Sequence, residues 1–257
     1  MDGTDIEILE IFGPWNNPEL ALDVAERAKR VRARFAFRQM CFAFSESRIA
    51  ASVGFQSGRG ARTESKASSL EMIDAEHLLL GRKAKASAEV RADLEYRVDT
   101  WHRYLKTHAA LAENGASIAV NTVDRIVREF AGRAAIPGNI VGGPVVGTFG
   151  TTMLELIRAG GNWSRHRGEW GRDRLKWDDH HKNRSVRVLS RCMIYHLDDN
   201  VFSQILDKLP YETWIELEEA VQRITRSLVH FAFEPPYLST REDDLFRDKP
   251  NGGVTNL

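Results

Sequence analysis

Apolar residues recur at steps of three and four along most of the chain, and this spacing is the feature that most restricts the possible folds. Between residues 18 and 52 it runs through Val24, Ala28, Val31, Phe35 and Phe42, which places an apolar stripe along one amphipathic helix. Strand patterns are scarce, since no turn dipeptide is flanked by two alternating apolar and polar runs. The sequence therefore predicts an all-α protein.

The first helix is expected to begin at Pro18 and to end near residue 52. Asn17 can cap its start, and proline suits the first turn because its missing N–H would be unpaired there in any case. Gly54, Gly58 and Gly60 follow within a polar stretch. Glycine and polar residues in such a run predict a loop that ends the helix.

Further helical patterns follow along the chain. A weaker one covers residues 65–80, a stronger one residues 86–113, and a shorter one residues 118–130. Two Pro and five Gly then interrupt residues 136–150, and a new helix is expected from about Thr151. Near the end, apolar residues alternate steps of three and four, the seam of a helix packed lengthwise against another. The residues of this seam are Trp214, Leu217, Val221, Ile224, Leu228 and Phe231.

These segments predict a multi-helix bundle with long antiparallel helices. Residues 1–233 are expected to form a single helical domain, in which residues 136–150 are a loop or hinge between two helical halves. Residues 234–257 contain few apolar side chains and include an Asn-Gly-Gly sequence near their end. They are expected to be a flexible tail.

Composition excludes several classes of protein. The 257 residues are 42% apolar and balance 36 basic against 36 acidic side chains, so a folded core is expected and avid, sequence-blind binding of nucleic acid is not. Cys41 and Cys192 lie far apart, without a neighbouring Cys, which supports neither a disulfide framework nor a zinc cluster. No apolar run is long enough to span a bilayer, and no signal sequence opens the chain. A cytoplasmic protein without a membrane span is expected.

Two stretches contain residue types that bind ions. Glycines 142, 143, 147 and 150 precede a helix start, where backbone amides can hold an anion, but the lysine of a phosphate-binding P-loop is absent and a plain hinge is the favoured interpretation. Residues 178–181 read Asp-Asp-His-His. Neighbours on a helix point in different directions and cannot all reach one metal ion, so a solvated turn is favoured there.

The most suggestive stretch for chemistry covers residues 158–177. If it is helical, Arg158, Asn162 and His166 lie four residues apart in one row, which Glu169 and Asp173 continue. Tryptophans at positions 163, 170 and 177 form a neighbouring stripe. An imidazole beside guanidinium and carboxylate groups could transfer protons on a ligand that stacks against aromatic rings.

Such a strip would suit RNA, because Arg can hold phosphate, His can move a proton on or off a ribose oxygen, and Trp can stack a base. No metal or cofactor would be required. The structural alternative is that the tryptophans form core and the polar strip makes pairs within its own helix. Glycines 160, 161, 168 and 171 also oppose a continuous helix, since each costs roughly 1 kcal/mol relative to alanine.

Asn162-Trp163-Ser164-Arg165-His166 resembles the second half of the Arg-polar-x-x-x-His signature of HEPN-domain ribonucleases. That resemblance implies an all-helical, metal-independent endoribonuclease of a toxin–antitoxin or phage-defence system, with motifs from two domains facing each other in a dimer. The family places its Arg directly before the polar residue, where this chain has Gly161. Arg158, one turn earlier, and Arg165 are the candidates to supply the missing cation.

The expected site therefore has His166 as general acid or base, with Asn162 positioning it and Arg158 or Arg165 on the phosphate. The substrate-binding candidates that flank it are Trp163, Trp170, Arg167 and Glu169. The resemblance implies a homodimer, an RNA substrate and an antitoxin or regulatory partner. Looser Arg–His pairs, such as Arg103 with His108 and Arg191 with His196, rank below this one.

The alternative function is a non-catalytic helical module for interaction with proteins. In that hypothesis, the apolar seam between residues 214 and 231 and the basic helix near Arg27 bind a partner chain or a second subunit.

Overall fold

A computed structural model describes residues 18–82, 87–136, 142–166, 184–194 and 200–233 of the chain. The described residues contain six α-helices, one short 3₁₀ turn at Thr148–Gly150 and a single isolated β-bridge between Val145 and Thr152. The predicted all-α class is confirmed. The proposed tail, residues 234–257, lies outside the described residues.

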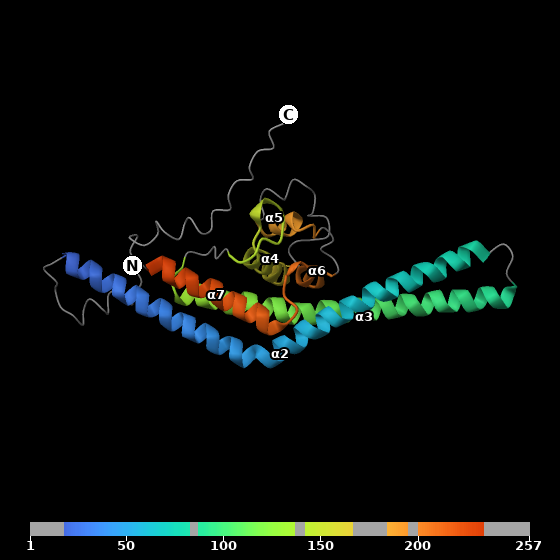
Figure 1. The fold of residues 1–257 in the computed structure, drawn as a ribbon, viewed down its shortest axis with the longest axis horizontal. Coiled ribbons are helices and arrows are strands. Elements are labelled where there is room, and N and C mark those ends of the chain that lie inside the picture. Colours follow the sequence, from blue (N-terminus) through green and yellow to red (C-terminus); the bar gives the residue numbers. More distant parts are fainter. Residues whose placement is uncertain (1–17, 83–86, 137–141, 167–183, 195–199, 234–257) are drawn as a thin grey trace, which may run out of the picture.

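Two long antiparallel helices form the frame of the molecule (Figure 1). Helix α2 runs over Pro18–Arg82 and α3 over Ala88–Arg133. At one end of the pair the two helices continue as a bare hairpin beyond the other elements, and at the other end α7 lies alongside them. The long antiparallel helices expected from the apolar spacing are therefore present.

Helix α2 does not end near residue 52, and the predicted loop at Gly54, Gly58 and Gly60 is wrong. The glycines at 54 and 58 are instead places where α2 touches α3. A Cβ on Gly54 would lie 2.9 Å from the carbonyl oxygen of Gly115, and one on Gly58 would lie 2.8 Å from the backbone nitrogen of Ala116. Close backbone contact offsets the low helix propensity of glycine here.

Helix α3 is likewise one helix where two were predicted. Ser87 precedes it and accepts a hydrogen bond from the backbone nitrogen of Val90 at 3.4 Å. Gly115, in the predicted break, lies inside α3 and packs on α2, because a Cβ there would meet backbone atoms of Gly54 and Gly58, both at 2.6 Å. The close contact of Gly54 and Gly58 with Gly115 therefore explains why the predicted end of α2 near residue 52 and the predicted break in α3 were both wrong.

Helix α7, Trp214–Phe233, contains the apolar seam. Trp214, Leu217 and Val221 are fully buried in the core, and Ile224 and Leu228 are partly buried against it. The buried carboxylate of Glu218 accepts hydrogen bonds from Trp214 Nε1 at 3.0 Å and from both Nη2 and Nε of Arg48 in α2, at 2.7 and 3.1 Å. The described side chains of the seam pack on the core of this chain, so Trp214, Leu217 and Val221 are not open to a partner.

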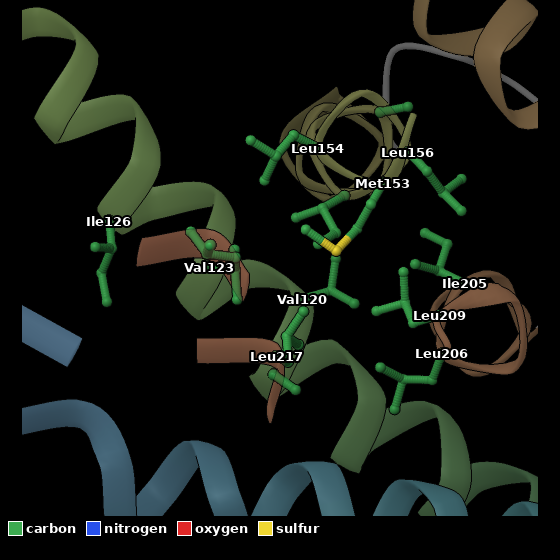
Figure 2. Close-up of a cluster of buried hydrophobic side chains, with 14 of the residues drawn as sticks. Val120, Val123, Ile126, Met153, Leu154, Leu156, Ile205, Leu206, Leu209 and Leu217 are labelled. Atoms are coloured by element: carbon green, nitrogen blue, oxygen red, sulfur yellow. The ribbon is translucent and has the colours of Figure 1, made fainter. Parts of the chain in front are cut away.

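Three shorter helices cover the middle of the long pair: α4 (Met153–His166), α5 (Arg184–Arg191) and α6 (Val201–Lys208). Figure 2 shows the core between α3, α4 and α6, where the side chain of Met153 points from α4 toward Val120 of α3. Ile205 and Leu206 of α6 close the same cluster. This packing fixes the position of α4 relative to α3.

The glycine-rich segment before α4 is irregular, as predicted, and the helix begins at Met153. Its first amides are occupied within the chain. The nitrogen of Thr152 donates to Glu155 Oε2 at 3.0 Å, that of Met153 to the carbonyl of Pro144 at 3.0 Å, and that of Leu154 to the carbonyl of Gly142 at 3.2 Å. The amides of these three residues are therefore not left for an anion.

Within the part of the chain that the structure describes, no helix combines the length and apolar character needed to cross a bilayer.

Candidate functional site

The predicted row on α4 exists as far as the structure describes it. Arg158, Asn162 and His166 lie on one continuous helix, four residues apart. Gly160 and Gly161 do not interrupt that helix, because both are buried contact points. A Cβ on Gly160 would lie 2.5 Å from Ile205 Cδ1, and one on Gly161 would lie 2.2 Å from Asp124 Cγ.

A buried carboxylate from α3 organises the residues around α4. Asp124 is 3% exposed, and its Oδ2 accepts hydrogen bonds from Arg165 Nη1 at 2.5 Å and from Arg128 Nε at 3.0 Å. Its Oδ1 is buried without a hydrogen-bond partner among the described residues. Two charge-assisted bonds to one oxygen compensate for much of the cost of burying the carboxylate.

Asn162 uses both ends of its amide. Its Oδ1 accepts from Arg165 Nη2, and its Nδ2 donates to the hydroxyl of Ser185 in α5 at 2.8 Å. The sequence predicted that Asn162 positions His166. In the structure these two hydrogen bonds hold the guanidinium of Arg165 and join α4 to α5.

Four arginines lie close enough for their charges to interact, and we call them the arginine cluster: Arg128 from α3, Arg158 and Arg165 from α4, and Arg184 from α5. Arg128 and Arg165 bind Asp124 directly, and the charge of Asp124 also acts on Arg158. Burial lowers the pKa of Arg158. The negative charge of Asp124 acts in the opposite direction, and the positive charges of Arg184, Arg128 and Arg165 lower the pKa further.

The arginine cluster keeps part of its surface open. The side chains of Arg184, Arg128 and Arg165 are 53%, 41% and 34% exposed, and Arg184 also contacts Glu155 at 3.3 Å. Among the described side chains here, four guanidinium groups therefore face two carboxylates, those of Asp124 and Glu155. A surplus of planar, multi-donor cations favours an oxyanion such as a phosphate.

His166 is the last residue of α4 and is half-buried. It follows Arg165 directly in the chain and continues the row of Arg158 and Asn162. Helix α4 therefore carries His166 together with two arginines of the cluster, Arg158 and Arg165.

The other predicted site residues have different positions. Trp163 is 6% exposed and belongs to the hydrophobic core, so its ring is not open for stacking on a base. Trp163 is therefore a core residue, as the structural alternative to an RNA-binding strip predicted. Trp170, Arg167 and Glu169 lie outside the described residues, as does the Asp-His run at 178–181.

The described residues of the rival Arg–His pairs have partners other than a cluster of arginines. Arg103 lies on the bare hairpin and pairs with Asp99 one turn earlier, at 2.6 Å. The ring of His108 packs against Tyr104, with 4.1 Å between centroids. His196 lies outside the described residues.

Sequence reasoning missed Asp124 and Arg128 on α3 and Arg184 and Ser185 on α5. Asp124 was the detectable one, since it stands beside Val123 within the apolar pattern of its helix and has Arg128 one turn later. Its meeting with α4, 41 residues farther along the chain, is a tertiary contact. Among the described residues, no three side chains of His, Cys, Asp or Glu form a group that could hold a metal ion.

No protein-family model matches the chain, and neither the search of curated proteins nor that of solved structures found a significant match.

Proposed function

We propose that the chain is a HEPN-like, metal-independent endoribonuclease of the cytoplasm, in which the arginine cluster binds a phosphate of RNA. One observation supports this most directly. The arginine cluster brings four guanidinium groups from three helices to only two carboxylates, Asp124 and Glu155, and α4, which carries two of these arginines, ends at His166. A role as a toxin or in phage defence, with an antitoxin partner, follows only from the resemblance.

In the proposed reaction, a base removes the proton of a ribose 2′-hydroxyl, whose oxygen attacks the neighbouring phosphorus. The bond from phosphorus to the 5′-oxygen breaks, and that oxygen takes up a proton. The products are a 2′,3′-cyclic phosphate and a 5′-hydroxyl. His166 is one of the two proton-transferring groups, and Arg158 and Arg165 stabilise the charge that develops on the phosphoryl oxygens.

The first prediction concerns His166→Ala. With tRNA and mRNA as substrates and EDTA present throughout, we expect the wild-type chain to cleave and the variant to lose about 100-fold or more of the rate, the usual contribution of a proton-transferring side chain. His102→Ala is the matched control, because His102 lies on α3, outside the arginine cluster, and contacts Glu76 of α2 at 3.4 Å. Equal cleavage by wild type and His166→Ala, or none by either, would refute the catalytic role.

A non-catalytic helical interaction module is the second candidate. It is favoured by large apolar side chains that remain exposed on α2, among them Phe35 at 60% and Phe42 at 65%. Wild-type protein that assembles normally and leaves RNA intact would support this candidate over the first.

A further inference from the structure

Helix α2 has a second apolar face that no described element covers. The face toward the core is lined by Ala33, Ala36, Met40, Phe44, Ala51 and Phe55, all at most 3% exposed. On the opposite side lies a row of large apolar side chains that we call the outer stripe. Its members are Val31, Phe35, Phe42, Ile49 and Val53, which are 60–81% exposed. In Figure 1, α3, α7 and the shorter helices lie on one side of the first, blue part of α2, before the two long helices cross.

The outer stripe is large enough to act as an interface. At 100° per residue its five members fall within about 40° of one direction, so they form one continuous row. A phenylalanine side chain has about 150–250 Å² of surface, so Phe35 and Phe42 alone expose roughly 200–300 Å². Contiguous apolar patches of about 300–600 Å² on a monomer often mark interaction sites.

The members of the outer stripe are placed symmetrically about Phe42. Phe35 and Ile49 lie seven residues before and after it, Val31 and Val53 lie eleven residues before and after it, and all four are apolar. Two residues of opposite charge, Arg38 and Glu46, flank the stripe four residues before and after Phe42.

We infer that α2 pairs with α2 of a second copy of this chain, antiparallel, with Phe42 on the two-fold axis. In that arrangement Phe35 lies opposite the partner subunit's Ile49, and Val31 lies opposite the partner subunit's Val53. Apolar residues therefore meet apolar residues, and the same surface of both copies forms the interface, as two-fold symmetry requires. Arg38 then lies opposite the partner subunit's Glu46, and the reverse pair forms by symmetry. These are the charged residues nearest the middle of the outer stripe, and they meet with opposite signs.

The α2 pair is inferred from α2 alone and does not depend on the proposed function. In Figure 1, α3 lies between α2 and α4. The two arginine clusters of an α2 pair would therefore lie away from the interface rather than face each other. The tests below measure mass and cross-linking, not RNA cleavage, so the two proposals can fail separately.

The second prediction concerns Phe42→Glu, which places two carboxylates against each other on the axis. By sedimentation or light scattering we expect wild-type full-length protein to have twice the chain mass of 29.1 kDa, and the variant to have the chain mass with an unchanged far-ultraviolet spectrum. Leu70→Glu is the matched control, since Leu70 is 68% exposed on the same helix and off the outer stripe. A monomeric wild type, including one in which the chain's own ends cover the stripe, or a dimer that survives Phe42→Glu, would overturn the inference.

Charge reversal tests the register. Arg38→Glu alone and Glu46→Arg alone each create two like-charged pairs, and we expect each to weaken dimerisation by about tenfold or more. The double variant Arg38→Glu with Glu46→Arg restores opposite charges and should return the dimer to near wild-type affinity. Failure of the double variant to recover would contradict pairing about Phe42.

Cysteine cross-linking tests the direction of the pair. In a Cys41→Ala background, Phe42→Cys should form an intermolecular disulfide, because the two positions meet on the axis. Ile49→Cys should not, since antiparallel pairing separates position 49 from its copy by 14 residues of helix, about 21 Å, whereas a disulfide needs Cα atoms within about 7 Å. Efficient cross-linking through Ile49→Cys would indicate a parallel pair and reject the antiparallel one.

Discussion

Gly115→Ala is expected to destabilise the protein by about 3 kcal/mol, because the added methyl group enters a backbone contact between the two long helices. The new Cβ would lie 2.6 Å from the carbonyl oxygen of Gly54 and 2.6 Å from the backbone nitrogen of Gly58. Backbone atoms inside a helix cannot turn away as a side chain can. The helices must therefore separate along their crossing. Thermal and urea unfolding followed by circular dichroism measure the loss.

Gly60→Ala is the control for this prediction. The substitution is chemically identical, it lies on α2 two residues beyond Gly58, and a Cβ there would have nothing within 4 Å. It should be neutral or stabilise the protein by up to about 1 kcal/mol through helix propensity. If Gly115→Ala and Gly60→Ala change the unfolding free energy alike, the close crossing of α2 and α3 is contradicted.

Gly161→Ala is expected to cost a comparable amount, about 3 kcal/mol, for a different reason. A Cβ at position 161 would lie 2.2 Å from Cγ and from Oδ2 of Asp124. The carboxylate cannot move freely, because Arg165 and Arg128 both donate hydrogen bonds to the same Oδ2. Gly161→Arg, which would restore the arginine of the HEPN signature, should destabilise the protein more and not raise cleavage.

A double-mutant cycle tests whether contact with Asp124 is the reason that Gly161→Ala is destabilising. In an Asp124→Gly background the clash is absent, so the further cost of Gly161→Ala should fall to a small fraction of its cost in the wild type. The two changes lie in contact and should therefore be strongly non-additive. Additive costs in urea unfolding would show that Asp124 is not what excludes a side chain at position 161.

Gly161 has a structural explanation of its own. It lies directly against Asp124, where a Cβ would have no room. Arg165, four residues farther along the same helix, donates to that carboxylate. The sequence showed a glycine at position 161 but could not show what lies against it, since Asp124 belongs to a different helix.

The apolar spacing was sufficient for the fold class but not for the helix boundaries. Glycine disfavours an isolated helix, so Gly54, Gly58 and Gly115 each predicted a break. In the structure these glycines lie inside helices because they let two backbones approach. Whether a glycine ends a helix or packs against another one depends on its contact partner, which local sequence does not contain.

The same limit applies to the apolar stripe of α2. Val31, Phe35 and Phe42 were correctly recognised as one face of a helix, yet the structure buries the opposite face through Ala33, Met40 and Phe44. Both faces are apolar, so periodicity alone could not choose between them. Only the packing of α3 and α7 decided which one became core.

The sequence by itself determined that the chain is helical, that α7 carries a packed seam, and that Arg158, Asn162 and His166 share one helix row. These properties depend on residues within a few turns of one another. Tertiary structure alone decided that Asp124 gathers the arginine cluster, that Trp163 is buried, and that the outer stripe stays exposed. Each of those depends on which distant segments meet, and local periodicity holds no information about such contacts.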